Sequence, residues 1–216
     1  MQPLDYPGPA ATVAGLLTAR GRWQRLDAGD VPDALRRGRT CVLAVGSNAS
    51  PPVLLAKLRA AGAPLAVALV PHEVAGLGVA HSAHVSPAGY VATTPYAAAG
   101  LRTRMVASWF GPAQLAALDA TEPNYRRGVL PPAVTGAPPG AEAYVSRWGV
   151  LSLGGVPVAP SGQADVHRLL ATDPVLSALL PLQDGPATVR ALLHPELRER
   201  VRRRLVDLGW VSPTGL

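Results

Sequence analysis

Short apolar runs separated by turn residues predict a series of β-strands through the middle of the chain. The first run, over residues 42–45, is wholly apolar, which is typical of a strand that is covered on both faces. Further strands are expected at residues 65–70, 90–94, 102–110, 129–134 and 143–151. Residues 74–82 favour an extended segment, and Pro95 is expected to end the strand that precedes it.

Apolar positions spaced by three and four residues predict helices between the strands and at both ends of the chain. Helices are expected at residues 51–61, at 112–120, at 164–180 with a break at Pro174, and at 186–208 with an interruption near Pro195. Near the N-terminus a short helical stripe is formed by Thr12, Val13, Leu16 and Leu17. Asp30 is a suitable N-cap for one or two further helical turns.

This order of elements indicates an α+β protein. We expect a curled mixed or antiparallel sheet, or a small β-barrel, with short helices and with helical N- and C-terminal extensions. The expected segments are a helical extension over residues 1–38, an α+β core over residues 39–157, and a helical segment over residues 158–216 that packs on the core. A length of 216 residues fits one domain, or one domain with an extension.

The net charge of +6 comes almost entirely from arginine, because Lys57 is the only lysine among 20 basic residues. The one basic cluster, residues 198–204, lies on the polar face of an expected helix whose apolar seam includes Val201 and Leu205. Glutamates at i,i+4 spacing accompany these arginines and no aromatic residue interleaves with them, so a nucleic-acid partner is not expected. No signal peptide or membrane-spanning run is visible in the sequence, which predicts a cytoplasmic protein without a membrane partner. Cys41, the only cysteine, is expected to be a buried structural thiol.

The three small residues Gly46, Ser47 and Asn48 end the first apolar run and lead into a helix. Ser50 is a suitable N-cap, and Pro51 suits the first helical position. Such a loop directs backbone N–H groups and the positive end of a helix dipole at one spot, which could hold a carboxylate, a phosphate or an oxyanion. The alternative is a tight strand-to-helix turn without a ligand.

Glu122 is the second candidate for chemistry, because it directly follows a short predicted helix that could aim its carboxylate inward. Pro123 stiffens the backbone after it, and Arg126 and Arg127 are close enough in sequence to hold the carboxylate ionised. The alternative is a surface carboxylate that pairs with Arg126 and contributes little free energy.

Three motifs occur in order along the chain: Val45-Gly46-Ser47-Asn48, Ala-Thr-Thr at 92–94, and Leu118-Asp119-x-x-Glu122-x-x-Tyr125-Arg126. Together they resemble the gamma-glutamylcyclotransferase-like family, and the resemblance covers about residues 40–135. Two positions depart from the family pattern. The tyrosine before Gly-Ser-Asn is Val45 here, and the glycine after the glutamate is Pro123.

The resemblance implies an enzyme that releases 5-oxoproline and an amine or amino acid from a small gamma-glutamyl substrate. Glu122 would be the catalytic acid and base, and an amino-acid-like substrate would be bound by Val45, Gly46, Ser47, Asn48 and Tyr125. No cofactor and no metal ion would be required.

A non-enzymatic binding or interaction protein of the same fold is the alternative function, and Val45 and Pro123 favour it. His81 and His84 would share a face only if they were helical, and no third ligand accompanies them, so a zinc site is not expected. The leaving amine, the oligomeric state and the role of the C-terminal helices stay open at the level of sequence.

Overall fold

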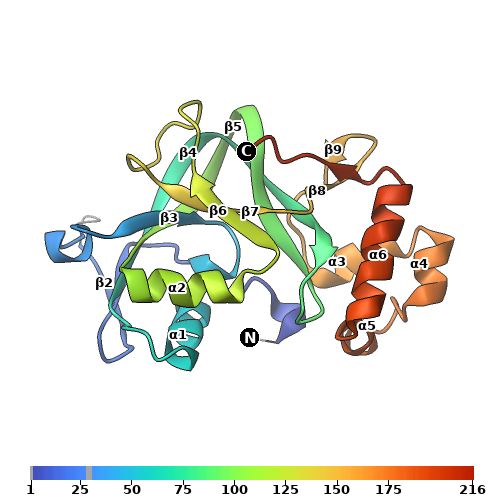
Figure 1. The fold of residues 1–216 in the computed structure, drawn as a ribbon, viewed down its shortest axis with the longest axis horizontal. Coiled ribbons are helices and arrows are strands. Elements are labelled where there is room, and N and C mark those ends of the chain that lie inside the picture. Colours follow the sequence, from blue (N-terminus) through green and yellow to red (C-terminus); the bar gives the residue numbers. More distant parts are fainter. Residues whose placement is uncertain (1, 28–30) are drawn as a thin grey trace. The chain divides into compact units, whose positions relative to one another are not determined.

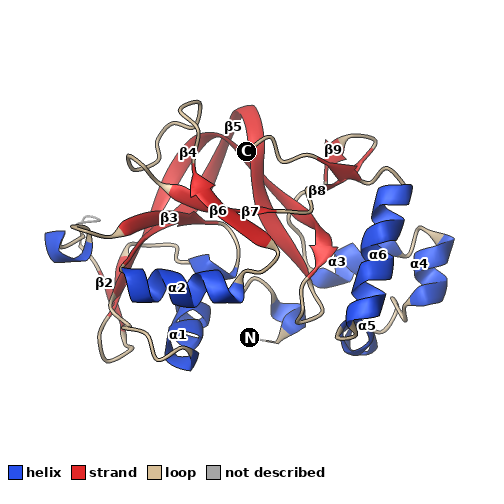
Figure 2. Ribbon diagram, viewed as in Figure 1, coloured by secondary structure: helices blue, strands red, loops and turns tan. Residues whose placement is uncertain are grey.

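The computed structural model describes residues 2–27 and 31–216 and shows an α+β protein with a large, mixed, open sheet (Figures 1 and 2). Its described strands are β1 (Gly15–Leu17), β2 (Trp23–Arg25), β3 (Thr40–Ala44), β4 (Val67–Val85), β5 (Val91–Phe110), β6 (Tyr125–Val129), β7 (Glu142–Ser146), β8 (Val150–Leu153), β9 (Val156–Pro157) and β10 (Val211–Ser212). The α-helices in the described part are α1 (Pro51–Ala60), α2 (Pro112–Thr121), α3 (Gln163–Leu170), α4 (Pro174–Leu179), α5 (Gly185–Leu192) and α6 (Pro195–Asp207).

The hydrogen-bonded strand order is β10-β8-β4-β5-β3-β7-β6, and β1, β2 and β9 pair outside this path. The β3–β5 pair is antiparallel whereas the β3–β7 pair is parallel, so the sheet is mixed. The α+β class with a mixed sheet and short helices, which the sequence predicts, is therefore confirmed.

The chain forms two compact units, each assembled from separate stretches. The first unit comprises the stretch that ends at Tyr6, together with Val79–Tyr96 and Ser146–Gly215. The second comprises Pro7–Gly78 and Ala97–Val145, together with Leu216. Because β4 and β5 each pass from one unit into the other, these units differ from the three consecutive segments expected from the sequence.

In the second unit, β3 is buried on both faces, as its unbroken apolar run predicts. Val42 and Ala44 face a cluster that contains Leu54 and Leu58 of α1 and Leu118 of α2. The alternate residues of β3, including Cys41 and Leu43, face a separate apolar cluster. Burial raises the pKa of the Cys41 thiol to about 12, which agrees with the structural role expected for it.

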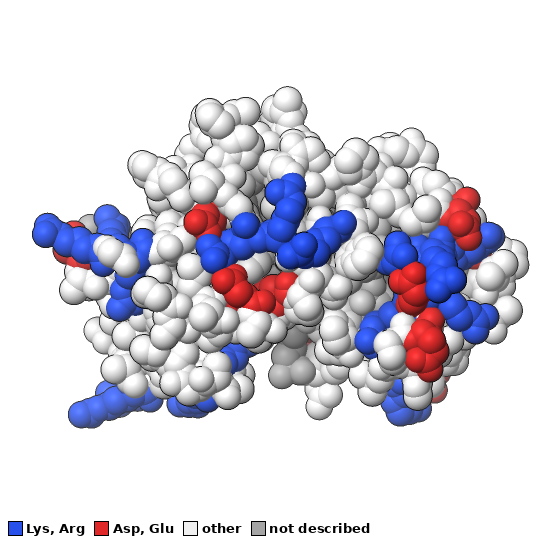
Figure 3. Space-filling model, viewed as in Figure 1, with Lys and Arg blue, Asp and Glu red and all other residues white. Residues whose placement is uncertain are grey.

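In the first unit, α3 to α6 lie close together (Figure 2). With β4, β5 and β8 they form an apolar cluster that includes Leu170, Leu192, Val201 and Leu205. The arginines of α6 lie among carboxylates, so that blue and red atoms interleave over this helix in Figure 3. Glu199 pairs with Arg202 and Arg203, and Asp173 pairs with Arg204. Among the described residues, no helix has both the length and the apolar character needed to cross a bilayer.

The helix expected near the N-terminus is wrong, because this stretch forms β1 instead. β1 pairs with β4 through Gly15↔Leu69 and Leu17↔Val67, and on its other side it pairs with β2. The backbone pairing thus outweighs the weak helical spacing of the apolar side chains. A Cβ atom at Gly15 would lie 2.1 Å from the indole of Trp23, so a side chain at this position would force the indole to move.

Residues 32–38 contain only a single 3-10 turn, Asp33–Leu35, where one or two helical turns were expected. Asp30, the expected N-cap, lies outside the described residues.

Three expectations about the strands are also wrong. Pro95 does not end a strand, since β5, which is 20 residues long, continues through it. β3 pairs only with the far end of β5, from Val106 to Phe110, so no β3 ladder requires an N–H group at Pro95. The strand expected at residues 129–134 lies earlier, at Tyr125–Val129, and the one expected at 143–151 is divided into β7 and β8.

A buried hydroxyl and imidazole network lies in the first unit. His84 Nδ1 and Ser82 Oγ share a hydrogen bond of 2.5 Å, and Ser82 Oγ donates to Ser146 Oγ at 2.7 Å. The Ser146 backbone N–H donates to Thr94 Oγ1 at 2.9 Å. Burial lowers the pKa of His84 from 6.5 to about 4, and it also lowers the pKa values of His81 and His167.

We therefore expect the free energy of unfolding to fall as the pH is lowered from about 6.5 towards 4. A lowered pKa in the folded state means that the unfolded chain binds protons first, so this stability is complete above pH ~6.5 and is lost below it. For His84 alone the shift corresponds to about 3 kcal/mol. Urea unfolding of the wild type and of His84→Asn across this pH range measures the effect.

In His84→Asn the free energy of unfolding is expected to fall less between pH ~6.5 and pH ~4 than in the wild type. His194→Asn changes an exposed position, so its free energy of unfolding should fall as much as that of the wild type. Equal pH profiles for His84→Asn and the wild type would contradict this account.

Candidate functional site

The loop after β3 forms a single 3-10 turn, Ser47–Ala49, immediately before α1. The Ala49 N–H donates to the Gly46 carbonyl at 2.9 Å, and the Ser50 N–H donates to the Ser47 carbonyl at 3.1 Å. Ser47 and Asn48 are both buried, with 7% of their surface exposed. The turn therefore presents one hydroxyl and one amide group at a protected position.

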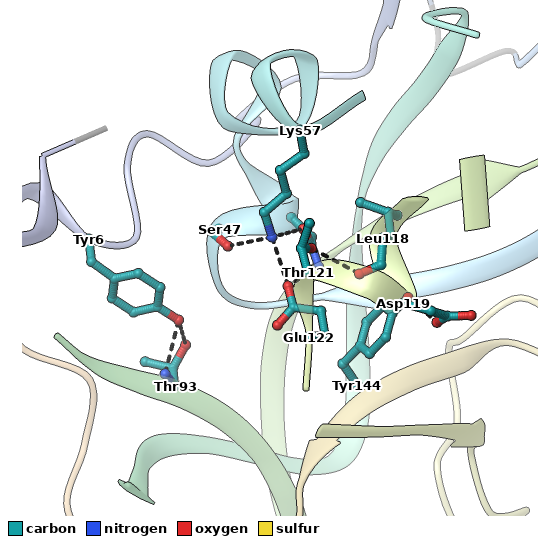
Figure 4. A network of polar contacts seen from close by, with 10 residues as sticks. Tyr6, Ser47, Lys57, Thr93, Leu118, Asp119, Thr121, Glu122 and Tyr144 are labelled. Carbon is teal, nitrogen blue, oxygen red and sulfur yellow. Dashed lines mark hydrogen bonds and ion pairs between the residues drawn. The ribbon is translucent and has the colours of Figure 1, made fainter. Parts of the chain in front are cut away.

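Lys57 of α1 reaches back to this turn (Figure 4). It lies nearly two turns into the helix, but side chains on a helix tilt towards its N-terminus. Its Nζ donates to Asn48 Oδ1 at 2.8 Å and to Ser47 Oγ at 3.3 Å. The helix and the turn that precedes it are therefore linked through an ammonium group.

Glu122 completes the cluster from the C-terminal end of α2, where it is the C-cap residue. Its Oε1 accepts hydrogen bonds from Lys57 Nζ at 2.7 Å and from Asn48 Nδ2 at 3.0 Å. Oε2 accepts none from the residues that the structure describes. The carboxylate thus meets the turn directly, although 74 positions separate Glu122 from Asn48 in the chain.

The Lys57–Glu122 pair is shielded but not sealed from water, since the exposed fractions of the two side chains are 18% and 14%. Asn48 receives a hydrogen bond from the cation on its carbonyl oxygen and donates one to the carboxylate from its amide nitrogen. Both ends of its side chain are therefore fixed. We call Ser47, Asn48, Lys57 and Glu122 the polar cluster.

A second network fixes the end of α2 from which Glu122 projects. Arg127 of β6 donates from Nε and Nη2 to the two carboxylate oxygens of Asp119, at 2.9 and 3.0 Å. Arg127 also pairs with Glu142 of β7, and Tyr144 of the same strand donates to Asp119 at 2.6 Å. The guanidinium of Arg127 holds the pKa of Asp119 below its usual range. Burial, followed by the contact with Asp119, raises the pKa of Tyr144.

The other site residues expected from the sequence are not part of the polar cluster. Val45 is half-buried and packs against the apolar cluster that contains Leu43. Gly46 has a φ of −105°, so the turn does not use the left-handed region. Tyr125 begins β6, and its backbone N–H donates to the Glu122 carbonyl at 3.0 Å.

Two expected contacts are wrong. Ser50 is the N-cap of α1, as the sequence predicts, but its side chain makes no capping hydrogen bond and its buried Oγ has no partner among the described residues. The cation beside Glu122 is Lys57 instead of Arg126 or Arg127, because Arg127 is held by Asp119 and Glu142. The alternative of a surface pair between Glu122 and Arg126 is also wrong, because the Glu122 side chain is only 14% exposed and pairs with Lys57.

Sequence analysis missed Lys57 as a site residue. A signal was present in the sequence, because Lys57 is the only lysine in a chain that otherwise uses arginine, and the two side chains differ in shape and hydrogen-bonding geometry.

An apolar pocket of about 390 Å³ lies elsewhere in the second unit. Its lining includes Pro9, Val13, Leu17, Trp23, Pro51 and Leu55. Lys57 is two positions beyond Leu55, which places it on the other side of the helix. The pocket is therefore separate from the polar cluster.

His81 and His84 lie on β4 and not on a helix. His81 Nε2 accepts a hydrogen bond from the Ser161 backbone N–H at 3.0 Å. The described residues contain no group of three histidine, cysteine, aspartate or glutamate side chains arranged to hold a metal ion.

The Ala-Thr-Thr motif lies in the first unit, where Thr93 interacts with the N-terminal stretch. The Tyr6 hydroxyl and Thr93 Oγ1 are 2.9 Å apart, and the Thr93 N–H donates to the Tyr6 hydroxyl (Figure 4). Tyr6 also stacks on Tyr90, with the ring centroids 4.2 Å apart.

The family models, the curated proteins and the solved structures with which we compared the chain contain no match to it. The resemblance to the gamma-glutamylcyclotransferase-like family therefore stays a prediction that depends on the three sequence motifs.

Lys57 and Glu122 should show strong energetic coupling in a double-mutant cycle with Lys57→Met and Glu122→Gln. Removing either partner alone leaves the other charge poorly solvated, whereas removing both does not. We expect a coupling free energy of about 1–3 kcal/mol from urea unfolding.

The matched control is the exposed pair Arg102–Glu73, whose side chains are 72% and 64% exposed. Its coupling should stay below about 0.5 kcal/mol. Equal coupling in the two pairs would show that the polar cluster is no more than a surface ion pair.

Proposed function

We propose that the polar cluster is the active site of a gamma-glutamylcyclotransferase-like enzyme that acts on a small gamma-glutamyl substrate. The observation that supports this most strongly is the direct hydrogen bond between Glu122 and Asn48. Two of the three motif segments that carry the family resemblance meet there, at a place largely shielded from water.

The proposed reaction needs few groups. Glu122 takes a proton from the α-ammonium of the substrate, and the amine then attacks the γ-carbonyl carbon of the same molecule. A C–N bond forms, Glu122 returns its proton to the leaving nitrogen, and the bond from that nitrogen to carbon breaks as the tetrahedral intermediate collapses. The second proton, on the new ring nitrogen, passes through Glu122 to the released amine, which leaves as an ammonium. Because the attack is intramolecular, holding the substrate in a ring-like conformation removes much of the barrier.

The geometry of Glu122 supports this role. Asn48 donates to Oε1, which fixes the direction of the carboxylate, and Oε2 is left to exchange the proton. The Asp119–Arg127 contacts hold the end of α2, so Glu122 projects from a rigid element. Ser47 and Asn48 supply polar groups for the substrate.

A binding protein without turnover is the second candidate, and Lys57 is the observation that favours it. In the proposed reaction the substrate's ammonium must approach Glu122, and the Lys57 ammonium already lies 2.7 Å from that carboxylate. A ligand can bind beside this pair without ever giving its proton to Glu122.

Release of 5-oxoproline from gamma-glutamyl amino acids, gamma-glutamyl amines and glutathione tests the proposal. We expect release from at least one of these classes and a loss of about 10²–10⁴-fold in kcat/KM for Glu122→Gln, because a positioned acid and base contributes that much.

Glu73→Gln is the control, since it removes an exposed carboxylate from the same unit, and it should retain full activity. Absence of release from every substrate, or an unchanged rate in Glu122→Gln, would reject the enzymatic function and leave the binding function.

A further inference from the structure

The Lys57 ammonium uses all of its hydrogen-bonding capacity within the polar cluster. It has three N–H donors, and three oxygens lie around it: Asn48 Oδ1, Ser47 Oγ and Glu122 Oε1. Two of these partners are neutral and one is an anion. Lys57 therefore has one charged partner, and that partner is the proposed catalytic carboxylate.

An α-amino acid carries the same two charges as the Lys57–Glu122 pair, an ammonium and a carboxylate, on one carbon atom. Such a ligand can replace the Lys57–Glu122 contact with two ion pairs of its own, one to each side chain. Its ammonium takes the place of Lys57 at Glu122, and its carboxylate takes the place of Glu122 at Lys57. No charge is left unpaired at either end of the exchange, which is the condition for a shielded site to accept a charged ligand.

The two arginines near Glu122 in the sequence do not contact its carboxylate. Arg127 is held by Asp119 and Glu142, and Arg126 is exposed. The Ser47–Ala49 turn is too short to supply a strong helix dipole. Among the described residues, Lys57 is therefore the cation that contacts both Glu122 and the Ser47–Asn48 turn.

We infer that Lys57 is the specificity-determining residue of this site and that it selects ligands with a free α-carboxylate beside the α-ammonium. The inference assigns anion binding to a side chain of α1 in place of the loop amides expected from the sequence. It rests on the proposed location of the active site, but it does not require that the site turn over a substrate.

Binding of an unreactive amino acid tests the inference at equilibrium. S-Butyl-L-homocysteine sulfone has a sulfone where a gamma-glutamyl amide has its carbonyl, so it cannot cyclise. Its carboxamide differs only in lacking the negative charge. We expect calorimetry to show that the wild type binds the acid at least about 10-fold more tightly than the carboxamide, as a charge-assisted contact predicts.

In Lys57→Gln this preference should fall to within about 2-fold, because the anion loses its charged partner while the amine still meets Glu122. Lys57→Met provides a second variant that keeps the length of the side chain. Arg59→Gln is the matched control, since it removes one positive charge from an exposed position of the same helix, and it should keep the wild-type preference. Thermal unfolding verifies that each variant is folded.

A 10-fold preference that persists in both Lys57 variants would overturn the inference. Absence of preference, or of binding, in the wild type would also overturn it. If the preference depends on Lys57 but no 5-oxoproline is released, the inference holds and the enzymatic function fails. If 5-oxoproline is released and KM for a gamma-glutamyl amine is unchanged in Lys57→Gln, the inference about Lys57 fails and the enzymatic function stands.

Discussion

The contact between the Lys57 ammonium and the Glu122 carboxylate connects the two parts of the second unit that carry the sequence motifs. Beside it, the Asn48–Glu122 hydrogen bond joins the turn to the end of α2, and apolar contacts of Leu54, Leu58 and Leu118 join α1 to α2. The apolar contacts bring the two helices together but do not fix the direction of a carboxylate. A hydrogen-bonded ion pair does so, because its strength depends on distance and on angle.

Neighbouring polar side chains stabilise the Lys57–Glu122 pair. Asn48 bonds to both charged groups with one side chain, and Ser47 Oγ accepts a further hydrogen bond from the ammonium. The network of Asp119, Arg127 and Tyr144 holds the end of α2 against β6 and β7. Lys57 and Glu122 thus each have a charged partner, which is what allows the two charges to stay in a position shielded from water.

The sequence predicted the parts of this arrangement that depend on local pattern. The apolar run of β3, the proline at the start of α1 and the position of α2 can all be read from neighbouring residues. The partner of Glu122 could not be predicted in this way, because Lys57 is 65 positions away and is brought close only by the packing of α1 against α2. The continuation of β5 through Pro95 was missed for a similar reason, since it depends on where β3 stops pairing.

Lys57 and Glu122 must form an ordered contact in solution if they define this site. Because Lys57 is the only lysine, labelling with ¹⁵N-lysine gives a single side-chain ammonium signal. If the contact exists, this signal should show slowed hydrogen exchange and a correlation with the Glu122 carboxylate carbon, and both should disappear in Glu122→Gln. A rapidly exchanging signal that is identical in the wild type and in Glu122→Gln would contradict the account.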